Sequence, residues 1–451
     1  MGVFFLNIKI DSRKVKKGDI FVAIGNGHNY IVDAFRNGAS KVIIEKGKVG
    51  HNIIKVRDTR VYLANYLKEK YYNKINDLKL IGVTGTNGKT TTAYLIYEAL
   101  NKAKIKCAYI GTIGFYLNDK VRDLENTTPE ILDIYEMLLE AIENNVKFVV
   151  MEVSSHALST NRVLGLEFDY AIFTNLTEEH LDYHKNMHNY FKCKKKLFKQ
   201  IKEDGLGIIN IDDKYGKRIK LKNKITISKI KGNYILNDYS LDDKTKFILN
   251  NKKYETKLKG LYNIYNMINV IILLDELGIK NKYKIIKNLD IAPGRMEIIN
   301  YKKSFVIIDY AHTPDAVLNV IKAVKDFAKS KIYVIIGCGG NRDKFKRPIM
   351  AKIASENSDL VILTSDNPRD EDAIDIINDM IKGIDKDNYQ IVVNRKDAIR
   401  KGMQLLENDD ILLVLGKGHE KYQIIGKDKI FFDDKIEIKK CIRRWLCVNT
   451  C

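Results

Sequence analysis

The sequence predicts an α/β protein with parallel sheets, divided into three domains. Short continuous apolar runs alternate with helical stretches along most of the chain. Strands of this kind are typical of parallel sheets whose two faces are both covered by helices. The length of 451 residues corresponds to about three domains of ordinary size. We therefore expect a small N-terminal domain, a central domain and a C-terminal domain.

The first predicted domain, residues 1–76, is a small α/β unit. Strands are expected at 20–24 (IFVAI) and 41–45 (KVIIE), with a helix between them at 30–39. A polar stretch at 72–79 then leads into the next strand. Little sequence precedes DSRK, and the AIGNGHNYI segment is short, so this domain is expected to be a shortened one.

The stretch LKLIGVTGTNGKTTTAYLIYEAL, residues 78–100, predicts a phosphate-binding loop. Residues 78–83 resemble a buried strand, 84–88 the loop, and Lys89 and Thr90 the first turn of a helix. In such loops backbone N–H groups and a lysine hold phosphate oxygens, while a hydroxyl binds Mg²⁺. The strict pattern has glycine where this chain has Val83, and a plain surface turn is the alternative. The strand-loop-helix context favours a P-loop ATPase-like parallel-sheet domain at 77–292.

The third predicted domain, residues 293–451, repeats one pattern of an apolar strand followed by a polar turn. Apolar strands that each end in a polar turn are expected within 304–316, 331–343, 359–372, 389–398 and 410–420. In open parallel sheets ligands bind beyond the carboxyl ends of the strands, where these turns fall. We therefore expect a Rossmann-like α/β binding domain.

The charge and composition narrow the class of protein. The net charge is +20, but the lysines are spread over almost every segment, which favours polyanionic small substrates over a nucleic-acid partner. A non-enzymatic nucleic-acid-binding protein is kept as an alternative. No apolar run approaches the roughly 20 residues of a membrane span, and the six cysteines form no C-x-x-C pair. A soluble, cytoplasmic protein without disulfide framework, zinc site or membrane association is expected.

Several side chains at predicted strand ends suit metal and substrate binding. Glu152 and His180, with the hydroxyl of Thr90, would suit Mg²⁺, although each could instead be a packing residue. Lys194 lies among other lysines, and a neutral amine there could add CO2 to form a metal-binding carbamate.

Polar turns of the third domain suit a zwitterionic amino acid. Arginine pairs with a carboxylate through two parallel hydrogen bonds, whereas an acidic side chain pairs with an ammonium group. Surface salt bridges are the alternative for each residue taken singly. The candidates are Arg342, Asp366, Asn367, Arg369 and Glu420.

The assembled motifs resemble those of the Mur ligases, in particular the MurE type that adds the third residue of the peptidoglycan stem peptide. The match covers nearly the whole chain, and GVTGTNGKTTT is that family's form of the phosphate loop. The other matching motifs are DSRKVKKGDIFVAI, NTTPE, MEVSSHAL, TNLTEEHLDYH, YFKCKKKLF, NIYN, PGRME, IDYAHTPDA, GCGGNRDKFKRP, SDNPR and GKGHE.

The resemblance implies a role for each matching residue. Lys89, Glu152, His180 and Lys194 would be catalytic, and Thr90, Glu152, His180 and carbamylated Lys194 would hold Mg²⁺. ATP would contact Gly85, Thr86, Asn87, Gly88, Lys89, Thr90, Thr91, Asn263, Asn266, Arg295, Asp309 and His312. The UDP-muramoyl-peptide would contact Ser12, Thr127, Thr128, Ser154 and Arg162, and diaminopimelate would contact Arg342, Asp366, Asn367, Arg369, Gly416 and Glu420.

The resemblance also implies a reaction. ATP would activate the D-glutamate carboxylate of UDP-N-acetylmuramoyl-L-Ala-D-Glu as an acyl phosphate, which the amine of meso-diaminopimelate would attack. Buried Arg369 and Arg342 would disfavour lysine by several kcal/mol as an order of magnitude, because their charge would stay unpaired. The alternatives are a ligase for L-lysine or for a different acceptor, and a folylpolyglutamate-synthetase-like amide ligase. A monomer is expected.

Overall fold

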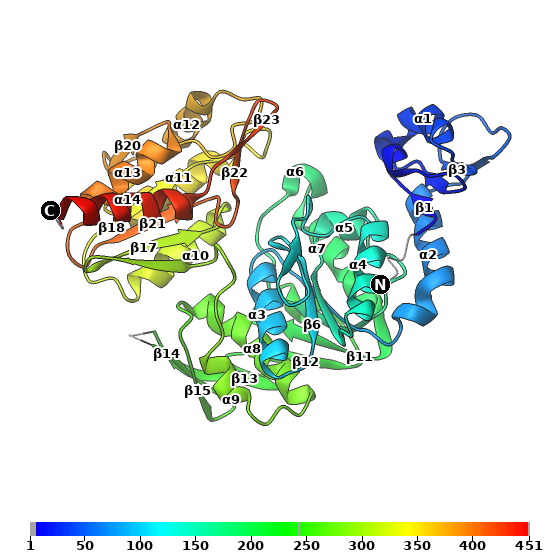
Figure 1. Ribbon diagram of the computed structural model, residues 1–451. Coiled ribbons are helices and arrows are strands. Elements are labelled where there is room, and N and C mark those ends of the chain that lie inside the picture. Colours follow the sequence, from blue (N-terminus) through cyan, green and yellow to red (C-terminus); the bar gives the residue numbers. More distant parts are fainter. Residues whose placement is uncertain (1–5, 242–243, 450–451) are drawn as a thin grey trace. The chain divides into compact units, whose positions relative to one another are not determined.

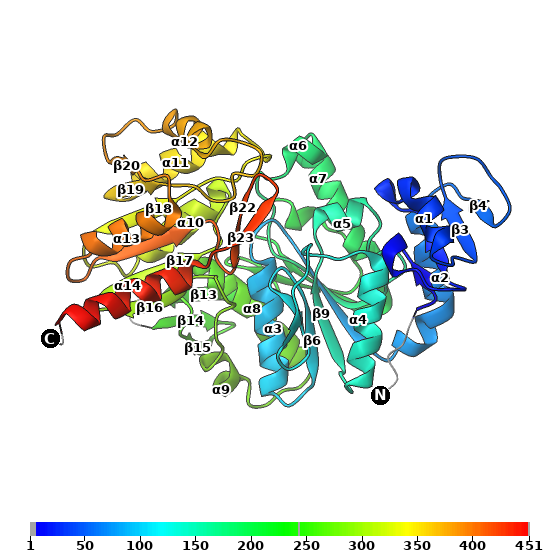
Figure 2. The same ribbon diagram turned by 45° about the horizontal axis from the view of Figure 1, so that its top comes forward.

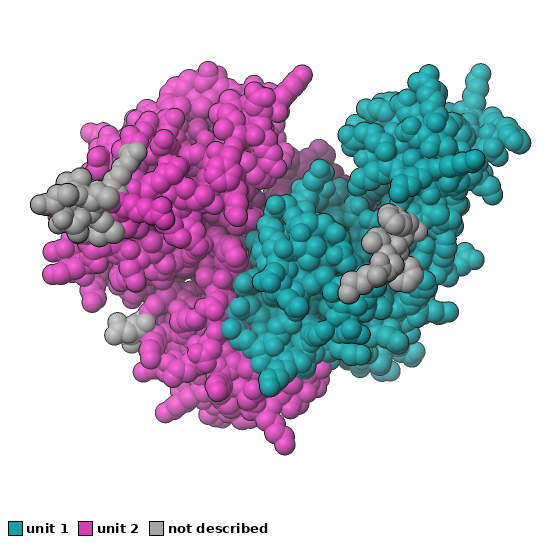
Figure 3. Space-filling model, in the orientation of Figure 1, with its two compact units in different colours: residues 1–85, 92–175, 188–227 teal, residues 86–91, 176–187, 228–451 magenta. Residues whose placement is uncertain are grey.

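The computed structural model describes residues 6–241 and 244–449. The chain divides into two compact units, shown in different colours in Figure 3. Unit 1 comprises residues 1–85, 92–175 and 188–227, and unit 2 comprises residues 86–91, 176–187 and 228–451. The division passes through the phosphate loop, between Gly85 and Thr86. The domain boundaries at 76/77 and 292/293 stay predictions.

The N-terminal part of unit 1 is a small parallel sheet with the order β1-β2-β3-β4. Its core includes Phe21, Ala34 and Val42. The predicted strands and helix of this region are therefore confirmed. The elements are β1 (Ile8–Lys9), η1 (Ser12–Lys14), β2 (Ile20–Val22), η2 (Gly25–Tyr30), α1 (Ile31–Arg36), β3 (Lys41–Ile44) and β4 (Ile53–Lys55).

Helix α2 (Thr59–Ile75) was not predicted, and the supposed polar connection at 72–79 begins inside it. Asp58 caps this helix, because its side chain accepts hydrogen bonds from the backbone N–H groups of Arg60 and Val61. The helix buries Leu63 and Leu67 among others. Its weak amphipathic pattern, with many lysines and tyrosines, explains why the sequence did not reveal it.

The main sheet of unit 1 has β5 near its centre and the order β12-β11-β10-β5-β9-β6-β7-β8. The pairs from β12 to β6 are parallel, whereas β7 and β8 add antiparallel strands at one edge. The strands are β5 (Lys79–Thr84), β6 (Cys107–Gly111), β7 (Gly114–Tyr116), β8 (Lys120–Arg122), β9 (Phe148–Glu152), β10 (Phe168–Phe173), β11 (Ile201–Asn210) and β12 (Lys224–Ser228). The helical segments are α3 (Lys89–Lys102), α4 (Ile131–Glu143), α5 (Ser155–Ser159), α7 (Met187–Lys194), η3 (Lys195–Lys199) and η4 (Gly216–Arg218). Two of these helices, α3 and α7, begin at residues that belong to unit 2.

The regular alternation of strand and helix predicted for the central block fails at residues 234–256. These residues, in unit 2, form the antiparallel strands β13 (Tyr234–Ser240), β14 (Thr245–Leu249) and β15 (Lys252–Thr256). Asn250 and Asn251 join β14 to β15 with φ of +47° and +61°. Two residues with positive φ make the tight hairpin turn that suits the twist of antiparallel strands. Helices α8 (Leu261–Glu276), which matches the predicted helix there, and α9 (Lys282–Lys287) follow.

The C-terminal part of unit 2 contains a sheet with the order β16-β17-β21-β18-β19-β20. The five predicted strands are all present and pair in parallel, and β16 adds an antiparallel edge. Residues of α10, α11 and α12 pack on one face, and residues of α13 and α14 pack on the other (Figures 1 and 2). The prediction of a parallel sheet covered on both faces is therefore confirmed.

The remaining bounds in unit 2 are as follows. The strands are β16 (Glu297–Tyr301), β17 (Ser304–Asp309), β18 (Ile332–Ile336), β19 (Leu360–Leu363), β20 (Tyr389–Ile391), β21 (Ile411–Leu415) and the hairpin β22 (Tyr422–Ile425) and β23 (Asp428–Phe431). The helices are α6 (Leu181–His184), α10 (Pro314–Lys325), α11 (Lys346–Asn357), α12 (Ala373–Ile381), α13 (Arg395–Leu405) and α14 (Asp434–Asn449).

Candidate active site

The phosphate loop follows β5 and leads directly into α3, as the sequence predicts. A Cβ atom at Gly85 would lie 1.9 Å from Oγ1 of Thr174. Gly88 has φ of +83°, and a Cβ atom there would lie 2.6 Å from Oδ1 of Asn266. Both positions therefore require glycine. Val83 stands at the place of the first glycine in the strict pattern. It is fully buried in β5, so this position belongs to the strand and the loop does not need a glycine there.

Within unit 2 the loop contacts several predicted ATP-site residues. Nζ of Lys89 donates to the carbonyl oxygen of Thr86 at 2.7 Å, and Oγ1 of buried Thr90 accepts from Nη2 of Arg295 at 3.0 Å. On α8, Nδ2 of Asn266 donates to Oδ1 of Asn263 at 3.1 Å. Thr91, in the first turn of α3, is also buried. The structure thus brings the loop, Arg295 and the two asparagines together.

Asp309, at the end of β17, holds the backbone beside Arg295. Its carboxylate accepts from the backbone N–H groups of Met296 and Ala311, both at 2.7 Å. Burial raises the pKa of Asp309, while the charge of Arg295 and these two hydrogen bonds oppose the rise. The guanidinium of Arg295 lies 4.5 Å from the centroid of the Tyr310 ring. Asp309 and Tyr310 together therefore orient Arg295.

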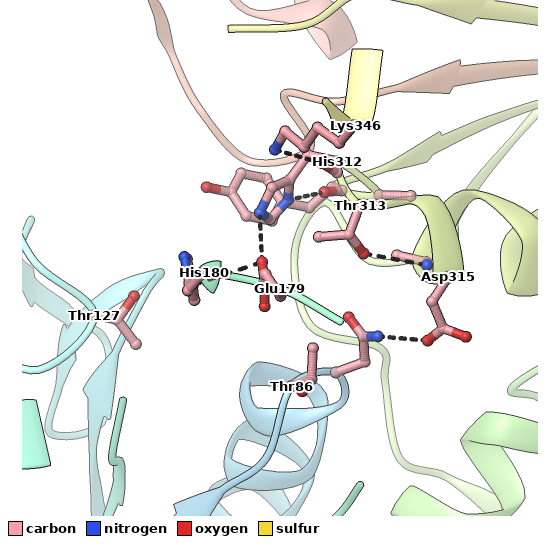
Figure 4. A network of polar contacts seen from close by, with 12 residues as sticks. Thr86, Thr127, Glu179, His180, His312, Thr313, Asp315 and Lys346 are labelled. Atoms are coloured by element: carbon pink, nitrogen blue, oxygen red, sulfur yellow. Dashed lines mark hydrogen bonds and ion pairs between the residues drawn. The ribbon is translucent and has the colours of Figure 1, made fainter. Parts of the chain in front are cut away.

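Glu179 links two predicted histidines of unit 2, as Figure 4 shows. Its Oε1 lies 3.6 Å from Nε2 of His312 and 3.7 Å from Nε2 of His180. Burial alone would raise the pKa of Glu179, but contact with His312 and the charges of His180 and Lys89 hold that pKa below its usual range. His180 has φ of +56°, a backbone conformation that is uncommon outside glycine and found at functional sites.

A second link in the same unit joins the phosphate loop to the start of α10. Nδ2 of Asn87 donates to Oδ2 of Asp315 at 2.7 Å, and Oγ1 of Thr177 donates to the same oxygen at 3.4 Å. Burial raises the pKa of Asp315, and the hydrogen bonds from Asn87 and Thr177 oppose that rise. Asp315 therefore fixes the loop side chain that precedes Gly88.

In unit 1, Glu152 ends β9 and is fully buried. Its Oε1 accepts from the hydroxyl of Tyr109 at 2.5 Å and from the backbone N–H of Thr112 at 2.8 Å. Oγ1 of Thr112 donates to Oε2 at 3.2 Å. A carboxylate held in one orientation by three donors is a preorganised oxygen ligand of the kind that Mg²⁺ prefers.

Four of the five residues predicted to hold the muramoyl-peptide, all except Ser12, form one network around Glu152. Oγ1 of buried Thr128 donates to the backbone carbonyl of Glu152 at 2.8 Å and accepts from the backbone N–H of Ser154 at 3.0 Å. Nη1 of Arg162 donates to the carbonyl of Thr128 at 3.1 Å. Oγ1 of Thr127 lies 3.1 Å from Oγ1 of Thr112. Ser12 lies in the small N-terminal sheet region, where its carbonyl accepts from Nδ2 of Asn37.

Lys194, at the end of α7, is almost completely buried. Its Nζ donates to the carbonyl oxygen of Gly85 at 2.6 Å and lies 4.7 Å from the centroid of the Tyr190 ring. Lys194 is therefore placed at the start of the phosphate loop within unit 1. Of the predicted metal ligands, Glu152 and Lys194 lie in unit 1, whereas Thr90 and His180 lie in unit 2.

The predicted amino-acid site lies at the carboxyl edge of the C-terminal sheet. Its residues follow the adjacent strands β18, β19 and β21. Nη1 of Arg369 donates to the carbonyl of Gly340 at 2.8 Å, and Nδ2 of Asn367 donates to Oε2 of Glu420 at 2.9 Å. A Cβ atom at Gly416 would lie 2.7 Å from Oδ2 of Asp366. The turns after three strands thus meet, as the topology predicts.

One expectation about this site is wrong, because Arg342 is exposed and Arg369 only half-buried. Asn341 has φ of +52°, and its backbone N–H donates to Glu371 at 2.6 Å. This turn directs Arg342 outward, where its Nη1 contacts the carbonyl of Asn341. Burial lowers the pKa of Arg369, and the charge of Arg342 lowers it further. The two guanidinium groups therefore still influence each other, although Arg342 is exposed.

Glu179, Asp315 and Lys417, which contacts Asn367 and Glu420, are three charged residues that were not singled out as site residues from the sequence. Each lies within a motif, but an acidic or basic side chain inside a motif is usually solvated. The signal that could have found them is that the fold shields their side chains, Glu179 and Asp315 in part and Lys417 completely, which the sequence does not show. Lys417 in particular has a side chain with 0% exposure.

Comparison with known proteins decides the family. Residues 83–274 match the Mur ligase middle domain, and residues 294–418 match the Mur ligase, glutamate ligase domain. A UDP-N-acetylmuramoyl-L-alanyl-D-glutamate–2,6-diaminopimelate ligase of Fusobacterium nucleatum is 43% identical, over 98% of this chain and 95% of that protein. The protein of the same name from Clostridium botulinum is 41% identical, over 97% of this chain and 95% of that protein. The chain belongs to the Mur ligase family.

Solved structures agree with this assignment. The structure of a UDP-N-acetylmuramoyl-L-alanyl-D-glutamate–2,6-diaminopimelate ligase has a TM-score of 0.68 and 31% identity, over 97% of this chain and 95% of that one. The MurF ligase of Thermotoga maritima in complex with ADP shares the fold, with a TM-score of 0.67 and 18% identity, over 98% of each chain. As a Mur ligase, the chain is an ATP-dependent ligase. Among its described helices, none combines the length and the apolar character that crossing a bilayer requires.

Proposed function

We propose that this Mur ligase joins meso-2,6-diaminopimelate to the D-glutamate of UDP-N-acetylmuramoyl-L-Ala-D-Glu in peptidoglycan precursor synthesis, and that it acts as a cytoplasmic monomer. The observation that carries the choice of amino acid is half-buried Arg369 beside Arg342, at the same sheet edge as Asp366, Asn367 and Glu420. Diaminopimelate has a second carboxylate that can form an ion pair with Arg369 and Arg342, whereas lysine has no second carboxylate. The relatives named above carry diaminopimelate in their names.

The reaction has two covalent steps. An oxygen of the D-glutamate carboxylate attacks the γ-phosphorus of ATP, and the bond to the β–γ bridging oxygen breaks, which releases ADP and leaves an acyl phosphate. The neutral amine of the amino acid then attacks the acyl carbon, the tetrahedral intermediate expels phosphate, and the nitrogen loses a proton. Lys89 and the phosphate loop would offset the negative charge that accumulates when two anions meet.

Magnesium is part of the proposal. The hydroxyl of Thr90, the carboxylate of Glu152 and the imidazole of His180 would be its ligands, and the preorganised oxygens of Glu152 fit this role. When bound, the ion would neutralise phosphate charge in the transition state. Lys194 would contribute as a carbamate, since its amine is buried at the first glycine of the loop. Lys194→Arg keeps the cation but cannot be carbamylated, so we expect it to lose activity that bicarbonate does not restore.

The test is phosphate release by the purified protein with ATP, Mg²⁺ and UDP-N-acetylmuramoyl-L-Ala-D-Glu, comparing meso-diaminopimelate with L-lysine. We expect release that depends on diaminopimelate, and a loss of the preference in Arg369→Ala. Release with lysine alone would overturn the specificity. If neither amino acid causes phosphate release, the protein uses a different acceptor. Glutamate-dependent phosphate release with a folate acceptor would favour the folylpolyglutamate-synthetase-like alternative.

A further inference from the structure

Lys417 is a fully buried cation inside the predicted amino-acid site. It follows β21 between Gly416, with φ of +110°, and Gly418, with φ of +54°. A Cβ atom at Gly418 would lie 2.7 Å from both the carbonyl oxygen of Gly294 and Cβ of Tyr310. The turn is therefore packed too closely against its neighbours for a side chain at that glycine, and the Lys417 side chain has 0% exposure.

The ammonium group of Lys417 closes a triangle of hydrogen bonds. Nζ donates to Oε2 of Glu420 at 3.1 Å and to Oδ1 of Asn367 at 3.3 Å. Nδ2 of Asn367 donates to the same Oε2 at 2.9 Å. Nζ also lies 5.6 Å from the centroid of the Tyr422 ring. Buried lysines are rare unless they are paired, and here both partners are residues of the predicted site.

The triangle determines the orientation of both partners. Oδ1 of Asn367 accepts from Lys417 and from the backbone N–H of Ile424 at 3.0 Å, so its amide nitrogen must face Glu420. Both contacts to Glu420 use Oε2. Oε1, on a side chain with 17% exposure, is thereby left for a ligand. A carboxylate oxygen held in this way suits an ammonium group.

We propose that Lys417 is a positioning residue for the incoming amino acid, which it affects only through Glu420 and Asn367. The inference rests on the proposed function. Without the Lys417 cation, Glu420 loses a charged donor and is free to rotate away from the ammonium group of the substrate. The consequence is weaker binding of the amino acid, with little effect on ATP, whose predicted contacts lie elsewhere.

The experiment compares the full-length wild type with Lys417→Met, which preserves side-chain length without charge. We expect KM for diaminopimelate to rise about tenfold or more, because a charge-assisted hydrogen bond is lost, while KM for ATP stays within about twofold. Exposed Lys421, on the same connection, provides the matched control Lys421→Met. Lys417→Gln, which keeps a donor but no charge, replaces the methionine variant if that variant does not fold.

A double-mutant cycle separates positioning from general packing. If Lys417 acts through Glu420, then Lys417→Met adds about twofold or less to KM for diaminopimelate in a Glu420→Gln background. Multiplicative effects, a parallel rise in KM for ATP, or an unchanged KM in Lys417→Met would each overturn the proposal. A wild type that releases phosphate with no diaminopimelate dependence would instead overturn the proposed function, and this inference with it.

Discussion

Asn87 of the phosphate loop donates its side-chain amide to Oδ2 of Asp315 at 2.7 Å, across 228 residues of sequence. The same carboxylate oxygen accepts from Thr177, which lies two residues before Glu179. One acidic residue at the start of α10 therefore orients both the loop expected to bind ATP and the segment that carries His180.

This relationship predicts that Asp315→Ala weakens ATP binding. Loss of a hydrogen bond to a charged group corresponds to about a tenfold change, so KM for ATP should rise about tenfold while KM for diaminopimelate changes little. Steady-state kinetics with each substrate varied in turn measures both constants. Asp326→Ala, at the exposed other end of the same helix, is the control. Equal effects of the two substitutions would contradict a specific role for Asp315.

The loop glycine Gly85 should not tolerate a side chain. A Cβ atom there would lie 1.9 Å from Oγ1 of Thr174 and 3.1 Å from the carbonyl of Asn175, so the loop backbone must move in Gly85→Ala. We expect kcat/KM for ATP to fall about a hundredfold or more, because misplaced loop N–H groups lose phosphate contacts. Gly278→Ala is the control, since it has φ of +66° but open space around it. It should cost about 1 kcal/mol of stability and little activity.

Glu152→Gln tests the buried carboxylate of unit 1. The substitution is nearly isosteric, but it removes the charge that would bind Mg²⁺ and sets an amide against the N–H of Thr112. We expect kcat to fall about a hundredfold or more, with raised Mg²⁺ requirement in a metal titration. Glu143→Gln, at the exposed end of α4, should behave as the wild type. An unchanged kcat in Glu152→Gln would exclude Glu152 from the reaction.

Glu371 makes stability depend on pH in acid. Contact with Arg347 is the main reason that the pKa of Glu371 falls from 4.5 to about 2. A carboxyl group with a lowered pKa in the folded state stabilises the fold fully above its unfolded pKa, and loses that contribution as pH falls toward its folded pKa. The difference in free energy of unfolding between wild type and Glu371→Gln should therefore be constant above about pH 5.5 and shrink between about pH 4.5 and pH 2.

Urea unfolding at a series of pH values measures this difference. Exposed Glu356, on α11 and paired with Lys352 at 3.8 Å, provides the control Glu356→Gln. A difference for Glu371→Gln that is the same at about pH 3 and pH 7 would show that the pKa of Glu371 is not lowered in the folded state.

Asp434→Asn should be strongly destabilising. Asp434 and Arg395 form an ion pair at 2.7 Å with 0% exposure of both side chains, and Nη2 of Arg395 also donates to the carbonyl of Leu415. Removing one partner leaves a buried, unpaired charge, which costs about 3–5 kcal/mol. Denaturant unfolding measures the loss, and Asp428→Asn on exposed β23 should change stability by less than about 0.5 kcal/mol.

The sequence was sufficient for the elements whose local pattern is strong. The strand β5, the loop from Thr84 to Gly88 and the start of α3 were predicted because glycines, a buried apolar run and a Lys-Thr pair together are specific to one local structure. The strands of the C-terminal sheet were predicted for a similar reason, since continuous apolar runs bounded by polar turns are typical of buried parallel strands. The hairpin of β14 and β15 was missed because its alternating pattern is short and rich in lysine.

Only the tertiary structure decided which side chains meet and which are buried. The sequence placed Arg342 in a strand-end turn, but the left-handed backbone at Asn341 directs it outward. Asn367 meets Lys417 and Glu420 across 50 and 53 residues of sequence, and Asn87 reaches Asp315 across 228 residues. Local sequence preferences act over a few residues, whereas burial and hydrogen bonding between distant turns depend on how strands are ordered in the sheet. The sequence alone thus determined the elements with a strong local pattern and the chemistry of each motif, and the order of the strands decided which motifs act together.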